Sequence, residues 1–389
     1  MIRTSVRLLA ILATLIPHAA LAEPAKTIKI GFLASLSGPQ AELGQYYLEG
    51  FKLGLEQLGN KLGGIPVELI VADDQAQPEV GVQQVRKLLD YDNVDFVSGV
   101  NFSNVLMAVY KPIVEHKTFF FSSFSGPAPL AGAQCNPYFF ATAVQNDQVY
   151  EGVGKTVSDQ PNVKKVFILV PNYQAGRDAV AGFRRYYKGD VVGEVYTKLN
   201  QPDYSSEIAQ IRAARPDAVY FFLPGGMAVN FMKQYAGARI GIPLYSGNSV
   251  DEVTIHAIGP IAAGAFSAAL YSDDLDNPRN REFVAAYREQ FGRRPSLYAA
   301  TAYDTVAFID LAVRAVNGDL SRQEGIRHAL ERAQPELVRG PFRFNTNHFP
   351  IQNIYALEAV NENGDLHMRT RGIIFENHAD AYAKDCPLR

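Results

Sequence analysis

The sequence has little net charge, few cysteines and no long hydrophobic run, and each of these absences excludes a class of protein. Its 389 residues include 37 basic and 40 acidic side chains, which give a formal net charge of −3. This balance lacks the positive surface that nucleic acids or anionic membranes attract. Because 47% of the residues are hydrophobic and 20% are charged, a disordered, collagen-like or coiled-coil chain is also excluded. The length instead suggests two globular domains.

Motifs of the common enzyme classes are missing as well. The sequence contains no G-x-G-x-x-G, G-x-x-x-x-G-K-[ST], G-x-S-x-G or H-E-x-x-H motif. None of its histidines form a pair at the helical spacing of metal ligands, so we expect no zinc site. Ser122 and Ser125 have no motif nearby that supplies a base, which a serine nucleophile needs. We therefore expect no catalytic residue, no metal and no cofactor.

Residues 1–22 have the pattern of a secretory signal peptide. Arg3 and Arg7 precede the apolar run Leu8–Ile16, and the segment ends in Ala20-Leu21-Ala22. The apolar run is far shorter than the roughly 20 residues that span a bilayer. No cysteine lies near the expected cleavage site, which disfavours a lipid anchor. We therefore expect a soluble, exported protein.

Cys135 and Cys386 are the only two cysteines of the chain. Export would place them in an oxidising compartment, where a disulfide can persist. The alternative is two separate buried thiols, since a bridge requires Cα atoms within about 7 Å of each other. We favour the disulfide, which would tie the C-terminus to the middle of the chain.

Short β-branched or aromatic runs alternate with longer amphipathic segments from Thr27 onward. This alternation predicts an α/β fold with mostly parallel sheets. It is interrupted by a polar stretch around 145–159 and then restarts. Short antiparallel strands are expected near the C-terminus, with a hairpin turn at Glu362-Asn363-Gly364-Asp365. Two similar blocks in succession predict two lobes with a cleft between them.

Two loops that follow neighbouring predicted strands have the composition of an anion-binding site. One contains Asn101-Phe102-Ser103-Asn104, and the other contains Ser123-Phe124-Ser125-Gly126. Both offer hydroxyl or amide groups, each holds a phenylalanine, and neither carries a charge. Neutral donors and helix N-termini can bind a carboxylate without a counter-ion. The alternative is that these residues only cap helices and form turns.

Four short motifs, in order along the chain, carry a resemblance to a known family. They are Ile30–Pro39, Val71–Asp74, Pro216–Val219 and Pro295–Asp304. They resemble the motifs of the type I periplasmic solute-binding proteins of the branched-chain amino acid (leucine/isoleucine/valine) ABC transporter class. The resemblance implies two lobes, each a mostly parallel sheet flanked by helices, joined by three hinge crossovers. It implies an N-terminal lobe of residues 23–143 plus 273–345 and a C-terminal lobe of residues 144–272 plus 346–389.

The resemblance also implies a function, because these proteins trap a ligand by hinge closure and deliver it to a membrane permease. We therefore expect a non-enzymatic, monomeric protein of the periplasm, the binding component of an ABC importer, with no nucleic-acid partner. In the family, a serine at the start of the third helix and the loop after the fourth strand grip the ligand carboxylate. The matching positions are Ser103 and Ser123–Gly126. A backbone amide near Gly126 is expected to serve where relatives often carry threonine.

Departures from the family pattern bear on the ligand. Amino-acid-binding members carry an acid just before a loop that here reads Ser246-Gly247-Asn248, but the acid is missing and Asp251 comes late. Burying an unpaired ammonium costs several kcal/mol, so an α-amino acid is disfavoured unless Asp251 substitutes. Phe102, Phe124 and Tyr173, with space at Gly225, would suit a flat ring.

The segments 101–105 and 171–176 further resemble the subgroup associated with aromatic carboxylates. The first expectation is therefore a small organic acid, in particular an aromatic carboxylate. A branched-chain or other hydrophobic amino acid is the alternative ligand. A ligand sensor that works with a signalling partner is the alternative role.

Overall fold

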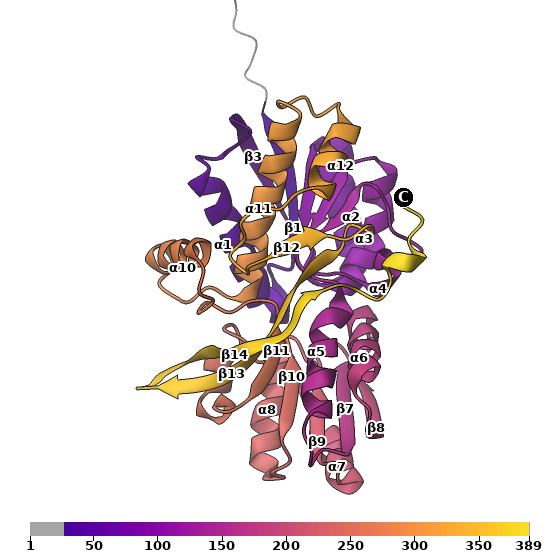
Figure 1. Ribbon diagram of the computed structural model, residues 1–389, viewed down its shortest axis with the longest axis vertical. Coiled ribbons are helices and arrows are strands. Elements are labelled where there is room, and N and C mark those ends of the chain that lie inside the picture. The colour runs from indigo at the N-terminus through magenta and orange to yellow at the C-terminus, as the bar shows by residue number, and fades with distance from the viewer. Residues whose placement is uncertain (1–26, 389) are drawn as a thin grey trace, which may run out of the picture.

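The computed structural model describes residues 27–388, so the predicted signal peptide at residues 1–22 lies outside the described residues. The chain forms two lobes, which stand one above the other in Figure 1, and each contains a sheet flanked by helices. Within residues 27–388, no helix combines the length and the hydrophobicity that a bilayer crossing requires. The predicted α/β class is confirmed.

The first lobe contains a six-stranded sheet in the order β2-β3-β1-β4-β5-β6, parallel except for β2. Helix α1 packs on α11, and α2 packs on α3. The strands are Ile28–Ala34 (β1), Lys61–Leu62 (β2), Ile65–Asp73 (β3), Phe96–Gly99 (β4), Phe119–Ser122 (β5) and Phe139–Ala141 (β6). The helices are Ala41–Gln57 (α1), Pro78–Arg86 (α2), Ser103–Glu115 (α3), Ala128–Ala131 (α4), Pro278–Phe291 (α10), Leu297–Ala315 (α11) and Gln323–Glu331 (α12).

The second lobe contains an eight-stranded sheet in the order β12-β13-β11-β10-β9-β7-β8, with β14 paired to β13. Strands β7–β11 are parallel, and β13 is antiparallel to its partners. The strands are Lys165–Pro171 (β7), Asp190–Thr197 (β8), Ala218–Phe221 (β9), Leu244–Gly247 (β10), Phe266–Ala269 (β11), Phe342–Phe344 (β12), Pro350–Glu362 (β13) and Asp365–His378 (β14). The helices are Asn146–Ser158 (α5), Gln174–Tyr186 (α6), Ser205–Ala214 (α7), Gly226–Ala238 (α8) and Ile255–Ile258 (α9).

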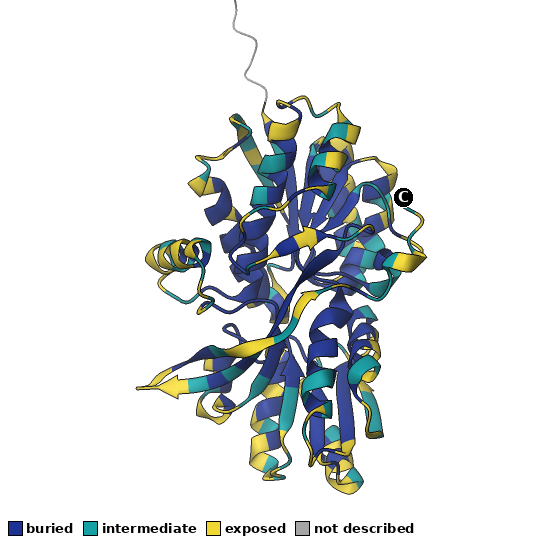
Figure 2. Cartoon of the chain, viewed as in Figure 1, coloured by how far each residue is buried: buried dark blue, intermediate teal, exposed yellow. Residues whose placement is uncertain are grey.

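The central strands of both sheets are buried, whereas β3, β8, much of β14 and the outward faces of the helices are partly or fully exposed (Figure 2). Four short helical turns complete the described chain: Gly38–Gln40 (η1), Lys87–Tyr91 (η2), Pro260–Ala262 (η3) and Ala383–Asp385 (η4). The predicted hairpin joins β13 to β14, where Asn363 and Gly364 have φ angles of 57° and 91°. Such left-handed pairs match the twist of the flanking strands.

The predicted three crossovers connect the lobes, after β6, after β11 and around β12. Strand β12 belongs to the second sheet by hydrogen bonding to β13. Its Phe342 and Phe344 nevertheless pack on Phe308 of α11, with ring centroids 4.9 and 5.1 Å away. The expected lobe boundary at residue 345 therefore falls beside a strand that contacts both lobes.

The polar stretch around 145–159, expected as an interruption, is instead the helix α5. Gln145 and Gln148 form a reciprocal capping box at its start, which satisfies two backbone donors. Asp147 and Glu151 are buried, and their carboxylates pair with Arg185 of α6. The polar residues of α5 therefore bind neighbouring elements instead of water. The sequence predicted an interruption here because polar residues usually face solvent in a loop.

The predicted disulfide between Cys135 and Cys386 is present, and the two Cα atoms are 5.6 Å apart. Cys135 lies between α4 and β6 of the first lobe, and the C-terminal tail reaches it past α5 (Figure 1). On the way, the Tyr382 hydroxyl donates a hydrogen bond of 2.7 Å to the Asp147 carboxylate. The tail is thus fixed to both lobes.

Replacing both cysteines, Cys135→Ser with Cys386→Ser, is expected to lower the free energy of unfolding by about 2–4 kcal/mol. The reason is that the bridge joins positions 251 residues apart and restricts the unfolded chain. Urea unfolding of the mature protein measures the change. Intact mass after alkylation without reductant is the control, and two alkylated thiols in the native protein would contradict the bridge.

Candidate ligand-binding site

A cavity lies between the two lobes. Several of its residues follow the carboxyl ends of strands from both sheets, the position at which open α/β sheets bind ligands. The first lobe contributes Leu43, Asn101, Phe102, Ser103, Phe124, Ser125 and Tyr298. The crossover and the second lobe contribute Val144, Asn146, Tyr150, Tyr173, Ala175, Phe222, Pro224 and Asn248.

The walls of the cavity are aromatic and uncharged. Phe102 and Tyr173 meet across the two lobes with ring centroids 6.5 Å apart, and Phe222 lies 6.3 Å beyond Tyr173. On the first-lobe side, Phe124 packs on Tyr298 at 4.5 Å. Every described residue that lines the cavity is neutral. Such walls favour a flat, apolar group.

Hydrogen-bond donors gather in the cavity at the start of α3. Asn101 accepts the Ser35 N–H through Oδ1 at 3.0 Å, which leaves its buried Nδ2 without a partner among the described residues. The Ser103 hydroxyl accepts a hydrogen bond of 3.1 Å from Asn146, so its own hydrogen is available to a ligand. The backbone N–H groups in the first turn of α3 have no partner within the helix and are further donors. The positive end of the helix dipole lies at the same place. This end of the cavity can therefore hold an anion.

Asn146, the first residue of α5, fixes these donors in place. Its Nδ2 donates to Ser103 Oγ and, at 2.8 Å, to Asp178 Oδ2, while its Oδ1 accepts the Gly126 N–H at 2.9 Å. Burial and the neighbouring Asp147 charge raise the pKa of Asp178 to about 7. Asn146 thus links two loops of the first lobe to α6 of the second.

The lobes are in contact around the cavity. Gln40, beside the start of α1, donates a hydrogen bond of 2.7 Å from Nε2 to Asn200 Oδ1 of the second lobe. The contact between Phe102 and Tyr173 is a second connection between the lobes, and both of these residues line the cavity. The two lobes therefore touch each other on both sides of the interface.

The structure brings together most of the residues that the sequence predicts for the site. Those that line the cavity are Asn101, Phe102, Ser103, Phe124, Ser125, Tyr173 and Asn248. The remaining predicted residues, Asn104, Ser123, Gly126, Gly225 and Asp251, do not line it. Each of them has another contact that explains its position.

Ser123 and Gly126 are engaged within the protein. The Ser123 hydroxyl is buried and shares a hydrogen bond of 2.6 Å with the Tyr47 hydroxyl. The Gly126 N–H, expected to reach the ligand, is donated to Asn146 instead. A side chain at Gly126 would collide with the Val144 carbonyl oxygen, so the threonine of relatives has no room here.

Asn104 and Gly225 lie to the side of the cavity. The Asn104 amide donates to the Ala76 carbonyl at 3.4 Å. Gly225 lines a neighbouring cleft, where its φ of 54° is in the left-handed region and any Cβ would collide with Gln40. The space expected at Gly225 is therefore occupied by Gln40 and not by a ring.

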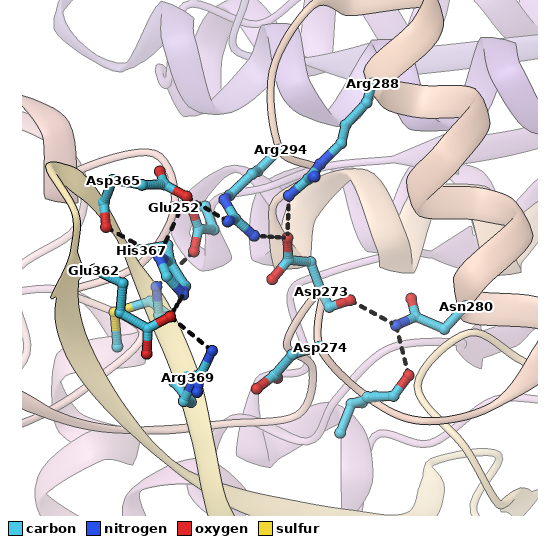
Figure 3. A network of polar contacts seen from close by, with 12 residues as sticks. Glu252, Asp273, Asp274, Asn280, Arg288, Arg294, Glu362, Asp365, His367 and Arg369 are labelled. Atoms are coloured by element: carbon cyan, nitrogen blue, oxygen red, sulfur yellow. Dashed lines mark hydrogen bonds and ion pairs between the residues drawn. The ribbon is translucent and has the colours of Figure 1, made fainter.

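Asp251, the residue considered as a substitute for the missing ammonium partner, lies outside this cavity. Its Oδ1 accepts the N–H groups of Val253 at 2.9 Å and Thr254 at 3.0 Å. It lines a second cavity together with Glu252 and Asp273. Glu252 accepts the Met368 N–H within the polar network of Figure 3, and burial raises the pKa of Glu252 to about 8.

Several cavity residues were not predicted: Leu43, Val144, Asn146, Tyr150, Ala175, Phe222, Pro224 and Tyr298. Phe222 and Pro224 follow β9, so the strand pattern already placed them at the same sheet edge as Tyr173. Tyr298 lies within the segment Pro295–Asp304 that carries the family resemblance. The remaining positions have no local signal, because helix packing and the crossover bring them to the cavity.

Comparisons with known proteins agree with this geometry. Residues 27–365 match the model of a family described as periplasmic binding protein. A solved structure of an ABC transporter solute-binding protein from R. palustris, in complex with benzoate, is 30% identical with a TM-score of 0.88. It aligns with 93% of this chain and 100% of its own chain.

Two further relatives are similar over nearly their full length. One is a solute-binding protein from Rhodopseudomonas palustris BisB5 with 3,4-dihydroxy benzoic acid, 26% identical over 91% of this chain and 99% of that chain, with a TM-score of 0.86. The other is the "Leu/Ile/Val-binding protein homolog 6" of Brucella melitensis, 27% identical over 93% of this chain and 95% of the relative. The family model, the two-sheet architecture and these relatives agree, and the chain belongs to the periplasmic binding protein family, with the type I fold of ABC transporter solute-binding proteins.

Proposed function

We propose that this protein binds a small aromatic carboxylate between its lobes and presents it to the permease of an ABC importer. The observation that carries the proposal is the cavity itself, with neutral aromatic walls and a cluster of donors at the start of α3. The 22-residue segment at the N-terminus would export the chain to the periplasm. We also propose that the protein acts as a monomer and binds no nucleic acid.

The donor cluster suits a carboxylate. Its members are the Asn101 Nδ2 group, the Ser103 hydroxyl and the unpaired amides of α3. Hydrogen bonds to a charged acceptor are worth about 1.5–3 kcal/mol each in a buried site, so several can replace a counter-ion. The benzoate and 3,4-dihydroxybenzoate complexes of the R. palustris relatives support this ligand class.

The same cavity disfavours an amino acid. A ligand ammonium would need an acidic partner, but the described lining residues are neutral. Asp178 lies behind Asn146 and already accepts hydrogen bonds from Asn146 and Gln174. A hydrophobic amino acid is the alternative ligand to be tested, because curated relatives are named as binding proteins for leucine, isoleucine and valine.

The cavity also supports binding without turnover. The Ser103 hydroxyl is hydrogen-bonded to the Asn146 amide and not to a base. No described neighbour is therefore placed to remove its proton and make it a nucleophile. Transport and sensing use the same closure, and a permease and ATPase encoded beside this chain would favour transport. We expect incubation with aromatic esters or amides to return them unchanged.

A thermal-shift screen of the purified mature protein tests the ligand class. At a concentration of 100 times its Kd, a ligand adds about 2.7 kcal/mol of stability. Benzoate or hydroxybenzoates are expected to raise the melting temperature, whereas leucine, isoleucine and dicarboxylates leave it unchanged. A shift with leucine-like amino acids alone would overturn the proposal.

Ser103→Ala and Ser123→Ala form a matched pair. Ser103→Ala should weaken the affinity for the aromatic acid by about 1–3 kcal/mol and leave stability nearly unchanged, because it removes a donor to the ligand. Ser123→Ala should lower the free energy of unfolding by about 1–3 kcal/mol without changing affinity, because it leaves the buried Tyr47 hydroxyl unpaired. Calorimetric titration and urea unfolding separate the two effects, and unchanged affinity in Ser103→Ala would remove Ser103 from the site.

Asn101→Asp tests the sign of the ligand charge. The substitution keeps an acceptor for the Ser35 N–H but replaces the free Nδ2 donor with a carboxylate oxygen. Loss of the donor and repulsion between like charges should weaken binding by at least about 2 kcal/mol at pH 7. Asn104→Asp, which adds the same charge outside the cavity, is the control and should retain most of the affinity. Equal losses in both variants would argue against direct contact by Asn101.

A further inference from the structure

Asn248 presents an unsatisfied amide to the cavity. It follows β10, it is only 5% exposed, and its Oδ1 has no hydrogen-bond partner among the residues of the described chain. The loop beneath it is held by Ser249, whose hydroxyl donates to Gly247 O at 3.1 Å and accepts the Leu223 N–H at 3.0 Å. A buried amide group without a partner is unfavourable, so this position calls for a polar group from a ligand.

The order of the strands places Asn248 away from the carboxylate donors. In the second sheet β9 lies between β7 and β10, and neighbouring strands are about 4.8 Å apart. Asn248, after β10, is therefore displaced by two strand spacings from Tyr173, which follows β7. Phe222, after β9, lies between them.

The carboxylate donors lie on the β7 side of this row. Phe102, at the start of α3, contacts Tyr173, and Asn146 connects Ser103 to Asp178 of α6. A ligand whose carboxylate binds these donors would extend its ring along Phe222 toward Asn248. The far edge of the ring then meets an amide and not an apolar wall.

We infer that Asn248 binds a hydroxyl group on the aromatic ring and that the ligand is a hydroxylated aromatic acid. This inference rests on the proposed function, and it adds that the ligand carries a hydroxyl group at the end opposite its carboxylate. A phenolic hydroxyl both donates and accepts hydrogen bonds, so it satisfies the amide of Asn248 whichever of its two polar atoms faces the ring. An unsubstituted ring, a methoxy group or a halogen offers no donor and leaves Oδ1 unpaired.

Two tyrosines support this assignment. Tyr150 and Tyr298 line the same cavity. Burial raises the pKa of each well above its ordinary value, so both stay neutral and can donate as well as accept. The cavity thus surrounds its aromatic centre with neutral groups that can exchange hydrogen bonds with a phenol.

Calorimetric titration of the mature protein with benzoate, 3-hydroxybenzoate, 4-hydroxybenzoate and 4-methoxybenzoate tests the inference. At least one hydroxybenzoate should bind about tenfold or more tightly than benzoate and 4-methoxybenzoate, because sites built to hydrogen-bond a hydroxyl reject analogues that lack it. Asn248→Gly should remove this preference, so that the hydroxybenzoate no longer binds more tightly than benzoate. Glycine is the appropriate replacement because the φ of Asn248 is 50°.

Asn317→Gly is the matched control, since Asn317 is exposed, remote from the cavity and has a φ of 53°. It should leave all four affinities unchanged. Equal binding of benzoate and the hydroxybenzoates, with no effect of Asn248→Gly, would overturn the inference while the proposed function stands. Failure of all four acids, with binding of leucine, would instead overturn the proposed function itself.

Discussion

The hydrogen bonds of the Asn146 side chain connect the parts on which the binding site depends. They reach Gly126 after β5, Ser103 at the start of α3 and Asp178 of α6. Because Asn146 directly follows the first crossover, its amide joins the lobes at the hinge. It also makes the Ser103 oxygen an acceptor within the protein, which directs the hydroxyl hydrogen toward the cavity. A single amide thus couples lobe closure to the geometry of the donors.

Several charged side chains near the cavity are paired with each other and do not line it. Asp147 and Glu151 pair with Arg185, and Asp273 pairs with Arg294. The described lining of the cavity consists of amides, hydroxyls, aromatic rings and a few aliphatic side chains. An anion held by such groups gains less from its charge than it would beside an arginine, so the fit of the ring and its substituents decides which acid is selected.

The sequence predicted the features that follow from strand order. Asn101, Ser103 and Tyr173 follow strands whose carboxyl ends meet, and the disulfide had only one candidate pair. Side-chain direction within a loop was not predictable, because Ser123 turns to Tyr47, which is 76 positions away in the chain. The helix α5 was missed for a related reason, since its polar side chains bind partners that only the folded lobes supply.

The bridge between Cys135 and Cys386 closes residues 135–386 into a covalent ring that contains strands β6–β14. A single cleavage of the backbone in any loop of the second lobe would open this ring without dividing the molecule. Both fragments would stay tethered at a high effective concentration, so the two halves of the cavity could meet again without diffusing apart. The oxidised protein should therefore tolerate a nick that would divide the reduced protein into two unlinked fragments.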